Sequence, residues 1–284
     1  MIKLQFHFLI TLVFLIISNF SKAQNSSMLY EISGNGLKQS SYLFGTQHMV
    51  PKEKFIMPKE LKEKIKSSKV LVFETDINPK ITEMMKLIPK MMLPSGQELK
   101  DIMDSLAFSN LEKFILDTLK MSEKKWKQSQ RFKPSILASM VMESSMKNTK
   151  SYEKEIGKIG KKKKIEKFET LEEQLNMLNS IDDTLFLGQI NSSMLKGLEQ
   201  LTNTYLTFNL DSVQKLLTSE PDYEEIDGKL IRNRNTAWIP KIETFISNNS
   251  TFIAVGAGHL PGSNGLIQLL RNKGYTINPI PLKF

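Results

Sequence analysis

The sequence predicts an α+β fold, with a small mixed sheet built from both sequence ends and a large helical insert between them. Apolar runs of strand character fall near the two ends of the chain, within 29–73 and 251–277. Between them, apolar residues recur at helical spacing. The 284 residues, of which 40% are hydrophobic and 24% charged, are typical of a globular chain and long enough to bury a large core.

The first 23 residues have the pattern of a secretory signal peptide. Lys3 precedes an apolar run over residues 6–17, which is shorter than the ~20 residues that cross a bilayer. Ser21 and Ala23 are the small residues that a signal peptidase requires. We expect residues 1–23 to be removed and residues 24–284 to form one exported domain, periplasmic or secreted, with no stable membrane span. A permanent N-terminal anchor is the alternative.

Six short runs rich in β-branched and aromatic residues predict the strands. Gly34, Asn35 and Gly36 separate the first two runs, which predicts an antiparallel hairpin. The third run is apolar at every position, as in a strand buried on both faces. The six predicted strands are 29–32, 41–44, 70–73, 165–168, 251–255 and 275–277.

Apolar spacings of three and four predict helices in the rest of the chain. Breaks at residues 94–96 and at Pro134 divide one long segment into roughly four helices. The segment 171–217 is long enough for two or three helices. The predicted helical segments are 58–68, 79–148 (divided as above), 151–164, 171–217 (two or three helices), 231–247 and 264–272.

The balance of charge is basic, with 39 Lys and Arg against 30 Asp and Glu. The densest basic run, Lys161 to Lys164, is interleaved with acidic residues such as Glu153 and Glu166 and has no aromatic residues for base stacking. We therefore expect a solvated turn and no nucleic-acid partner. The absence of Cys excludes disulfides, thiol catalysis and Cys-ligated metals.

Two histidines stand in the same short pattern, Gly-x-x-His. Gly45 precedes His48 and Gly256 precedes His259, and each pattern follows a predicted strand. Glu74 follows a third strand. Ligand sites of open α/β sheets lie at carboxyl ends of strands, so these three side chains are candidates for one site.

Two imidazoles and a carboxylate form a plausible ligand set for Zn, Mn, Co or Fe, and such a metal would lower the pKa of its bound water. The alternatives are histidines that make structural hydrogen bonds and a Glu74 carboxylate that faces solvent or caps a turn.

Several stretches together resemble the TraB/GumN family, which is similar to the Tiki metalloproteases. The resemblance implies the fold shared with erythromycin-esterase-like and haem-binding ChaN-like proteins. It also implies that His48, Glu74 and His259 are metal-binding or catalytic residues. The stretches are 42–48 with Pro51, 72–76, 168–175, 252–262, 265–266 and 274–275.

The resemblance adds a Glu and an Arg to the site. Glu169 matches the family's Glu, and Arg234 is preferred over Arg232 for the Arg, which would hold a substrate carboxylate or stabilise an oxyanion. A helix cap or a surface ion pair is the alternative for both.

The expected function is a metal-dependent hydrolase, specifically a peptidase that acts on peptides or protein termini outside the cytoplasm. Glu74 would be a metal ligand or a general base. The alternative is a non-catalytic binder of a secreted peptide or of a cofactor such as haem. No nucleotide-binding loop or serine-hydrolase motif is present.

Overall fold

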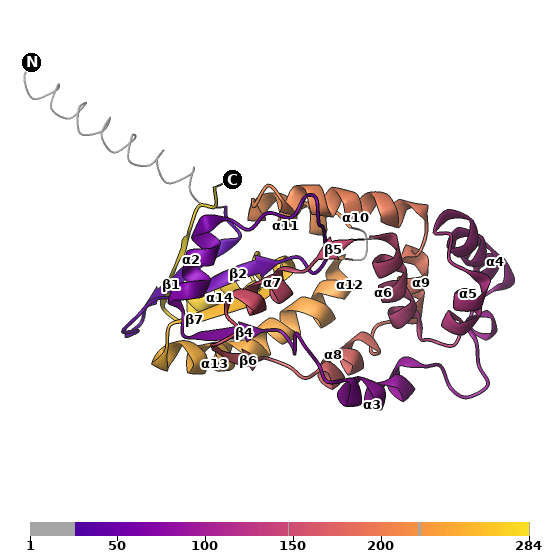
Figure 1. The fold of residues 1–284 in the computed structure, drawn as a ribbon, viewed down its shortest axis with the longest axis horizontal. Helices are drawn as coiled ribbons and strands as arrows, with labels where there is room; N and C mark the ends of the chain where they lie inside the picture. Colours follow the sequence, from indigo (N-terminus) through magenta and orange to yellow (C-terminus); the bar gives the residue numbers. More distant parts are fainter. Residues whose placement is uncertain (1–25, 147, 221–222, 284) are drawn as a thin grey trace, which may run out of the picture.

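The computed structural model describes residues 26–146, 148–220 and 223–283. The predicted signal peptide, residues 1–23, lies outside these ranges. Within them, the sheet and its covering helices form one part of the molecule, and helices from the middle of the chain form the other (Figure 1). None of the helices in the described ranges combines the length and the apolar character needed to cross a bilayer.

The main sheet draws strands from both ends of the chain, as the sequence predicts, and β6 from its middle, in the order β6-β4-β7-β2-β1-β8. The four strands β6, β4, β7 and β2 run parallel to one another, and β1 is antiparallel to both of its neighbours, β2 and β8. The connection from β1 to β2 turns at Asn35 and Gly36, both with positive φ. The strands are β1 (Leu29–Gly34), β2 (Ser41–Thr46), β4 (Val70–Phe73), β6 (Lys164–Lys167), β7 (Thr251–Gly256) and β8 (Tyr275–Pro279).

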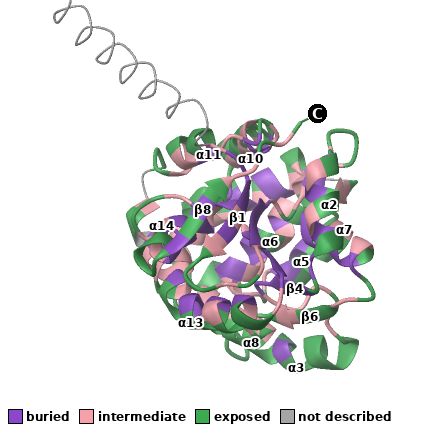
Figure 2. Cartoon of the chain, turned by 90° about the vertical axis from the view of Figure 1, so that its left-hand side faces the viewer, coloured by how far each residue is buried: buried purple, intermediate pink, exposed green. Residues whose placement is uncertain are grey.

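Helices cover both faces of this sheet. Figure 2 shows the strands between α2 and α7 on one side and α13 and α14 on the other. All residues of β2 and β4 are therefore buried, because parallel strands covered on both faces have no solvent side. The covering helices are α2 (Lys59–Ser67), α7 (Tyr152–Ile159), α13 (Asn233–Asn248) and α14 (Leu266–Asn272).

The middle of the chain forms a helical part with a second apolar core, centred on Ile115, Leu137 and Val141, which have no exposed surface. The breaks predicted at residues 94–96 and at Pro134 are present, since one helix ends at Met91 and another begins at Pro134. The elements of this first half are α3 (Ile81–Met91), η1 (Leu99–Asp101), α4 (Ser105–Lys113), the π-helix η2 (Phe114–Thr118), α5 (Glu123–Ser129) and α6 (Pro134–Ser145). A separate short ribbon pairs β3 (Val50–Pro51) with β5 (Thr149–Lys150).

The segment 171–217 contains more helices than the two or three predicted. Each begins at a polar residue whose side chain accepts a hydrogen bond from a backbone N–H of the first turn, namely Thr170, Asp182, Asn191 and Asn209. These caps divide the segment into four helices. The elements from here to α13 are α8 (Leu171–Leu178), α9 (Asp183–Gln189), α10 (Ser192–Tyr205), α11 (Leu210–Leu217), α12 (Tyr223–Asp227) and the π-helix η3 (Gly228–Arg232).

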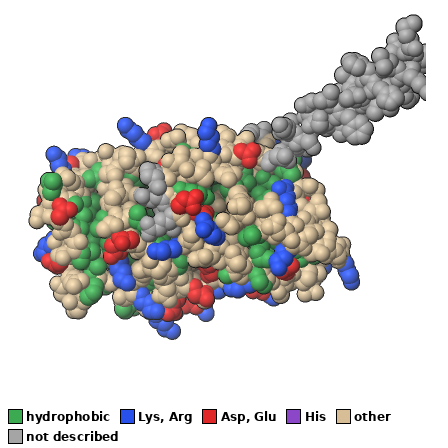
Figure 3. Space-filling view, turned by 180° about the vertical axis from the view of Figure 1, so that it is seen from behind, with side chains coloured by type: hydrophobic (Ala, Val, Ile, Leu, Met, Phe, Trp, Pro, Cys, Tyr) green, Lys and Arg blue, Asp and Glu red, His purple; other side chains and the backbone are tan. Residues whose placement is uncertain are grey.

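The basic run is not a uniformly solvated turn. The Nζ of Lys163 donates to the carbonyl oxygens of Lys66 and Ser68 at the C-terminal end of α2, where a positive charge is favourable. Lys164 already belongs to β6. On the molecular face drawn in Figure 3, Lys and Arg side chains are interspersed with Asp and Glu side chains.

Candidate functional site

Four neighbouring parallel strands deliver the predicted site residues to one edge of the sheet. In the order of the strands, Glu169 follows β6, Glu74 follows β4, His259 follows β7 and His48 follows β2. The parallel register aligns Thr46 with Gly256, so the two Gly-x-x-His segments begin side by side. The fold thus gathers at one edge residues that lie far apart in the sequence.

Both motif glycines allow a close approach that a Cβ would obstruct. A Cβ on Gly45 would lie 3.0 Å from the Cα of Ala257, in the other motif. A Cβ on Gly256 would lie 3.2 Å from Oε1 of Glu74, the oxygen that accepts a 2.6 Å hydrogen bond from the Gly256 N–H. The first glycine lets the motifs pack together, and the second lets a carboxylate reach the backbone.

Arg234 on α13 is the centre of a buried charge network. Its Nη2 lies 2.5 Å from Oε2 of Glu74, and its Nε lies 3.0 Å from Oε1 of Glu169. Its Nη1 donates to the carbonyl oxygen of Leu230 and lies 3.1 Å from Nε2 of His259. Nη2 also donates to Glu169, so the guanidinium directs all five of its N–H groups to acceptors within the protein. Arg232, the competing arginine, instead pairs with Asp227 and Glu224.

The carboxylate of Glu74 is buried and ionised. Burial alone would raise its pKa. The positive charge that His259 acquires only at acid pH, the charge of Arg234 and the hydrogen bond from Gly256 together hold the pKa well below its usual range. Both oxygens already accept hydrogen bonds, Oε1 from Gly256 and Oε2 from Arg234. Glu74 thus anchors the guanidinium in this arrangement.

His259 is buried and held from both sides of its ring. The side-chain amide of Asn235 donates to the carbonyl oxygens of His259 and Asn264, which directs the Oδ1 of Asn235 to within 2.7 Å of Nδ1 of His259. Since Oδ1 can only accept, Nδ1 carries the hydrogen and Nε2 has the lone pair that faces Arg234. Burial lowers the pKa of His259 to about 4, which keeps the imidazole neutral near pH 7.

His48 has a different environment. Its side chain is 67% exposed, and its Nδ1 lies 2.8 Å from Oε1 of Glu153 on α7. The negative charge of Glu153 raises the pKa of His48 to about 9. Burial would raise the pKa of Glu153, but His48 and hydrogen bonds from Ser151 and Thr46 lower it to about 2. The two side chains therefore form an ion pair at neutral pH.

The predicted metal ligands do not form a three-donor group. In the ranges that the structure describes, no three His, Asp or Glu side chains are placed to share one ion. Glu74 and His259 are neighbours, with 3.8 Å between Oε1 and Nε2, but the Arg234 guanidinium contacts both and uses the lone pair on Nε2. As arranged here, the residues do not fit a metal held by His48, Glu74 and His259.

Sequence reasoning missed two important residues. Glu153 was grouped with the acids around the basic run, and no local pattern links it to His48, which lies 105 positions earlier. Asn235 belongs to none of the patterns that the sequence analysis singles out. Helical spacing offers a signal here, because Arg234, Asn235 and Trp238 share one helix face, and Trp238 donates to Glu169 while its ring lies 4.6 Å from the Arg234 guanidinium carbon.

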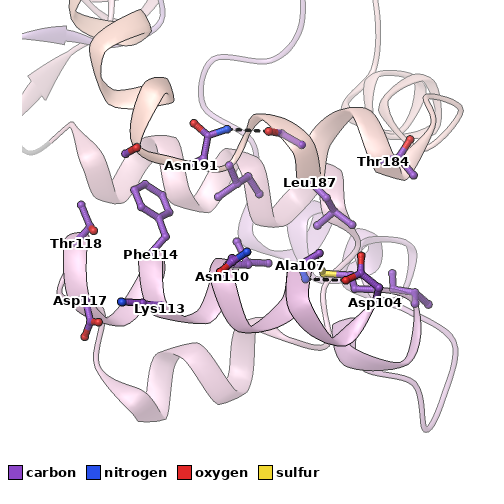
Figure 4. Close-up of a pocket in the computed structure, with 16 residues that line it drawn as sticks. Asp104, Ala107, Asn110, Lys113, Phe114, Asp117, Thr118, Thr184, Leu187 and Asn191 are labelled. Atoms are coloured by element: carbon purple, nitrogen blue, oxygen red, sulfur yellow. Dashed lines mark hydrogen bonds between the residues drawn. The ribbon is translucent and has the colours of Figure 1, made fainter.

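A cavity of about 630 Å³ lies in the helical part and contains none of these residues. Figure 4 shows Phe114, Leu187 and Asn191 among the side chains around it. Its wall combines apolar residues with Lys113 and Asp117 and has no histidine. This cavity is therefore separate from the site at the sheet edge.

The chain is similar in sequence to known proteins. The metalloprotease TIKI2 of Danio rerio is 24% identical over 327 residues, covering 92% of this chain and 62% of its own length. TIKI2 of Xenopus tropicalis is 23% identical over 85% of this chain and 58% of its own length, and the metalloprotease TIKI1 of Danio rerio is 22% identical over 85% and 61%. The chain thus spans about three fifths of the length of these relatives. No solved structure matches. The model of the TraB/PrgY/gumN family matches residues 28–279, and the chain belongs to that family.

Proposed function

We propose that this chain is a hydrolase that cleaves peptides or protein termini outside the cytoplasm, and that His48 is the side chain that exchanges a proton with the substrate. The observation that carries the proposal is the His48 environment: an exposed imidazole, bonded to a buried carboxylate, at the edge where four strands deliver His and Glu side chains. The names of the TIKI relatives support peptide hydrolysis. The predicted signal peptide supports an extracytoplasmic location.

The chemistry of the two histidines supports different roles. At neutral pH, His48 is protonated, because its pKa is raised to about 9 by the charge of Glu153. Its exposed imidazolium can donate a proton to the leaving nitrogen of a scissile amide, which is general-acid catalysis. Water adds to the carbonyl carbon as the C–N bond breaks, and the proton that this water releases restores the imidazolium. His259 is neutral, buried and bonded on both ring nitrogens, so it supports the charge network.

A divalent metal, with Mn, Co, Zn and Fe as the candidates, stays a separate prediction. Binding through Glu74 and His259 would require Arg234 to leave both of them. Elemental analysis of the full chain tests this prediction directly. Near-stoichiometric metal that is lost in both His48→Asn and His259→Asn would support the three predicted ligands.

The test of the proposed function is hydrolysis of a quenched-fluorescent peptide library by the full chain. We expect turnover by the wild type and a roughly 10²–10⁴-fold lower kcat in His48→Asn, as for loss of a general acid. Lys161→Gln, which changes an exposed charge elsewhere, is the control and should retain full activity. Saturable peptide binding without turnover would overturn the proposal in favour of the non-catalytic binder.

A further inference from the structure

The surroundings of His48 point to a role for Glu153. We infer that Glu153 is a positioning residue that keeps a hydrogen on Nδ1 of His48, so that Nε2 is the ring nitrogen directed to a substrate or ligand. This inference rests on the proposed function for its chemical meaning. Which nitrogen of the His48 ring carries the hydrogen can be tested without any substrate.

The first support is the way in which the carboxylate of Glu153 is held. Glu153 is only 9% exposed. Its Oε1 accepts a 2.5 Å hydrogen bond from Thr46 at the end of β2, and its Oε2 accepts one of the same length from Ser151, the N-cap of α7. Hydrogen bonds from a strand end and from a helix start thus fix the carboxylate independently of His48.

The second support is the direction of the remaining bond. Oε1 of Glu153 lies 2.8 Å from Nδ1 of His48. An ionised carboxylate can only accept, so Nδ1 must carry the hydrogen in both the neutral and the charged imidazole. The ring nitrogen that keeps an available lone pair in the neutral imidazole is then Nε2, and the orientation of the ring is fixed by the same bond.

The third support is a comparison with Glu155 on the same helix. Both residues are acidic and lie in the first turn of α7, where a negative charge is favoured by the helix dipole. Glu155 pairs with Lys158, whose side chain is 71% exposed, at 2.6 Å. Only Glu153 is directed inward to a histidine, so helix stabilisation alone does not explain its position.

The experiment is nitrogen NMR of the full chain labelled at histidine, at an alkaline pH where the imidazole of His48 is neutral. The chain has three histidines. The His48→Asn and His259→Asn variants assign their signals. We expect wild-type His48 to carry its hydrogen on Nδ1 alone. In Glu153→Gln, where a neutral amide can accept or donate, we expect this restriction to be lost and the Nε2–H form to become populated.

Glu155→Gln is the matched control, because it removes the same charge from the same helix turn, and it should leave the wild-type pattern unchanged. A wild-type His48 found mainly as the Nε2–H form would overturn the inference, even if Glu153→Gln did not fold. A folded Glu153→Gln protein with Nδ1–H as complete as in the wild type would also overturn it. If no peptide is hydrolysed, the proposed function fails while this result still decides the role of Glu153.

Discussion

The two Gly-x-x-His motifs have the same sequence pattern and opposite surroundings. His259 is 3% exposed and bonded on both ring nitrogens, and burial lowers its pKa to about 4. His48 is bonded on one nitrogen, is largely exposed, and has its pKa raised to about 9 by Glu153. The shared motif therefore determines the path of the backbone after each strand. The partner brought by another element, α13 for His259 and α7 for His48, specifies the chemistry.

The largest expected difference between the two regions is in stability. Arg234→Met leaves the buried carboxylates of Glu74 and Glu169 without their cation, so we expect a loss of about 3–5 kcal/mol in the free energy of unfolding. Urea denaturation measures it. Arg232→Met, which removes a 43% exposed side chain from its ion pairs, is the control and should lose clearly less. Equal losses would mean that the buried ion pairs of Arg234 stabilise the protein no more than the exposed pairs of Arg232.

The motif glycines should come next in size. Gly45→Ala forces a Cβ against the backbone of Ala257, and Gly256→Ala forces one against the Glu74 carboxylate. We expect each to lose about 1–3 kcal/mol by thermal or urea unfolding, as for overpacked sites. Gly197→Ala on α10, where a Cβ meets nothing within 4 Å, should be neutral or slightly stabilising. A tolerated alanine at position 45 would contradict the close packing of the two motifs.

The two histidines should also give stability opposite pH dependences. The folded pKa of His48 is raised, so its pairing with Glu153 stabilises fully below the ordinary value of 6.5 and is lost as pH rises through about 9. The folded pKa of His259 is lowered, so its contribution is present above 6.5 and is lost as pH falls through about 4.

Urea midpoints of the wild type, His48→Asn and His259→Asn across this pH range test the assignment. The difference between the wild type and His48→Asn should shrink on the alkaline side. The pH dependence of the His259→Asn protein should be weaker on the acid side. Proton NMR titration of the two imidazoles gives the same pKa order directly, and a reversed order would refute the comparison.

The smallest expected effect is that of His48→Asn on stability near neutral pH. Because the imidazole is largely exposed, water screens its charge, and Glu153 keeps its hydrogen bonds from Thr46 and Ser151, so we expect a change of at most about 1 kcal/mol in the free energy of unfolding. Chemical denaturation beside the activity assay separates this small effect from the large loss of turnover. A loss as large as that of Arg234→Met would indicate that His48 is also structural.

The sheet and the gathering of the site residues were largely predictable from local patterns. β4 begins and ends at the predicted residues, because an apolar β-rich run buried on both faces has few alternatives. The motif glycines and histidines could be found because a strand, a glycine and a histidine stand close together in the sequence. The sequence predicts too few helices in 171–217, because Asp182 and Asn191 also fit exposed positions within a helix. Only their hydrogen bonds to backbone N–H groups identify them as helix caps.

The partners of the two histidines could not be predicted by the same means. Glu153 reaches His48 only because α7 packs against the sheet beside β2, and that packing depends on residues distributed over the chain. The ion pairs of Arg234 likewise require α13, the end of β4 and Glu169, two residues after β6, to be placed together. Long-range packing determines which of these side chains meet. A single sequence has no periodic pattern that predicts such packing.

The position of β7 sets an order for the assembly of the protein. β7 lies between β2 and β4, although it is made about 180 residues after β4. A chain synthesised only as far as residue 250 therefore has a gap in the middle of its sheet and lacks His259. Its N-terminal hairpin has no partner for the β2 edge, and the site has no second motif. Contacts between distant residues form slowly, so a chain of this topology gains its site only after its last strands are complete.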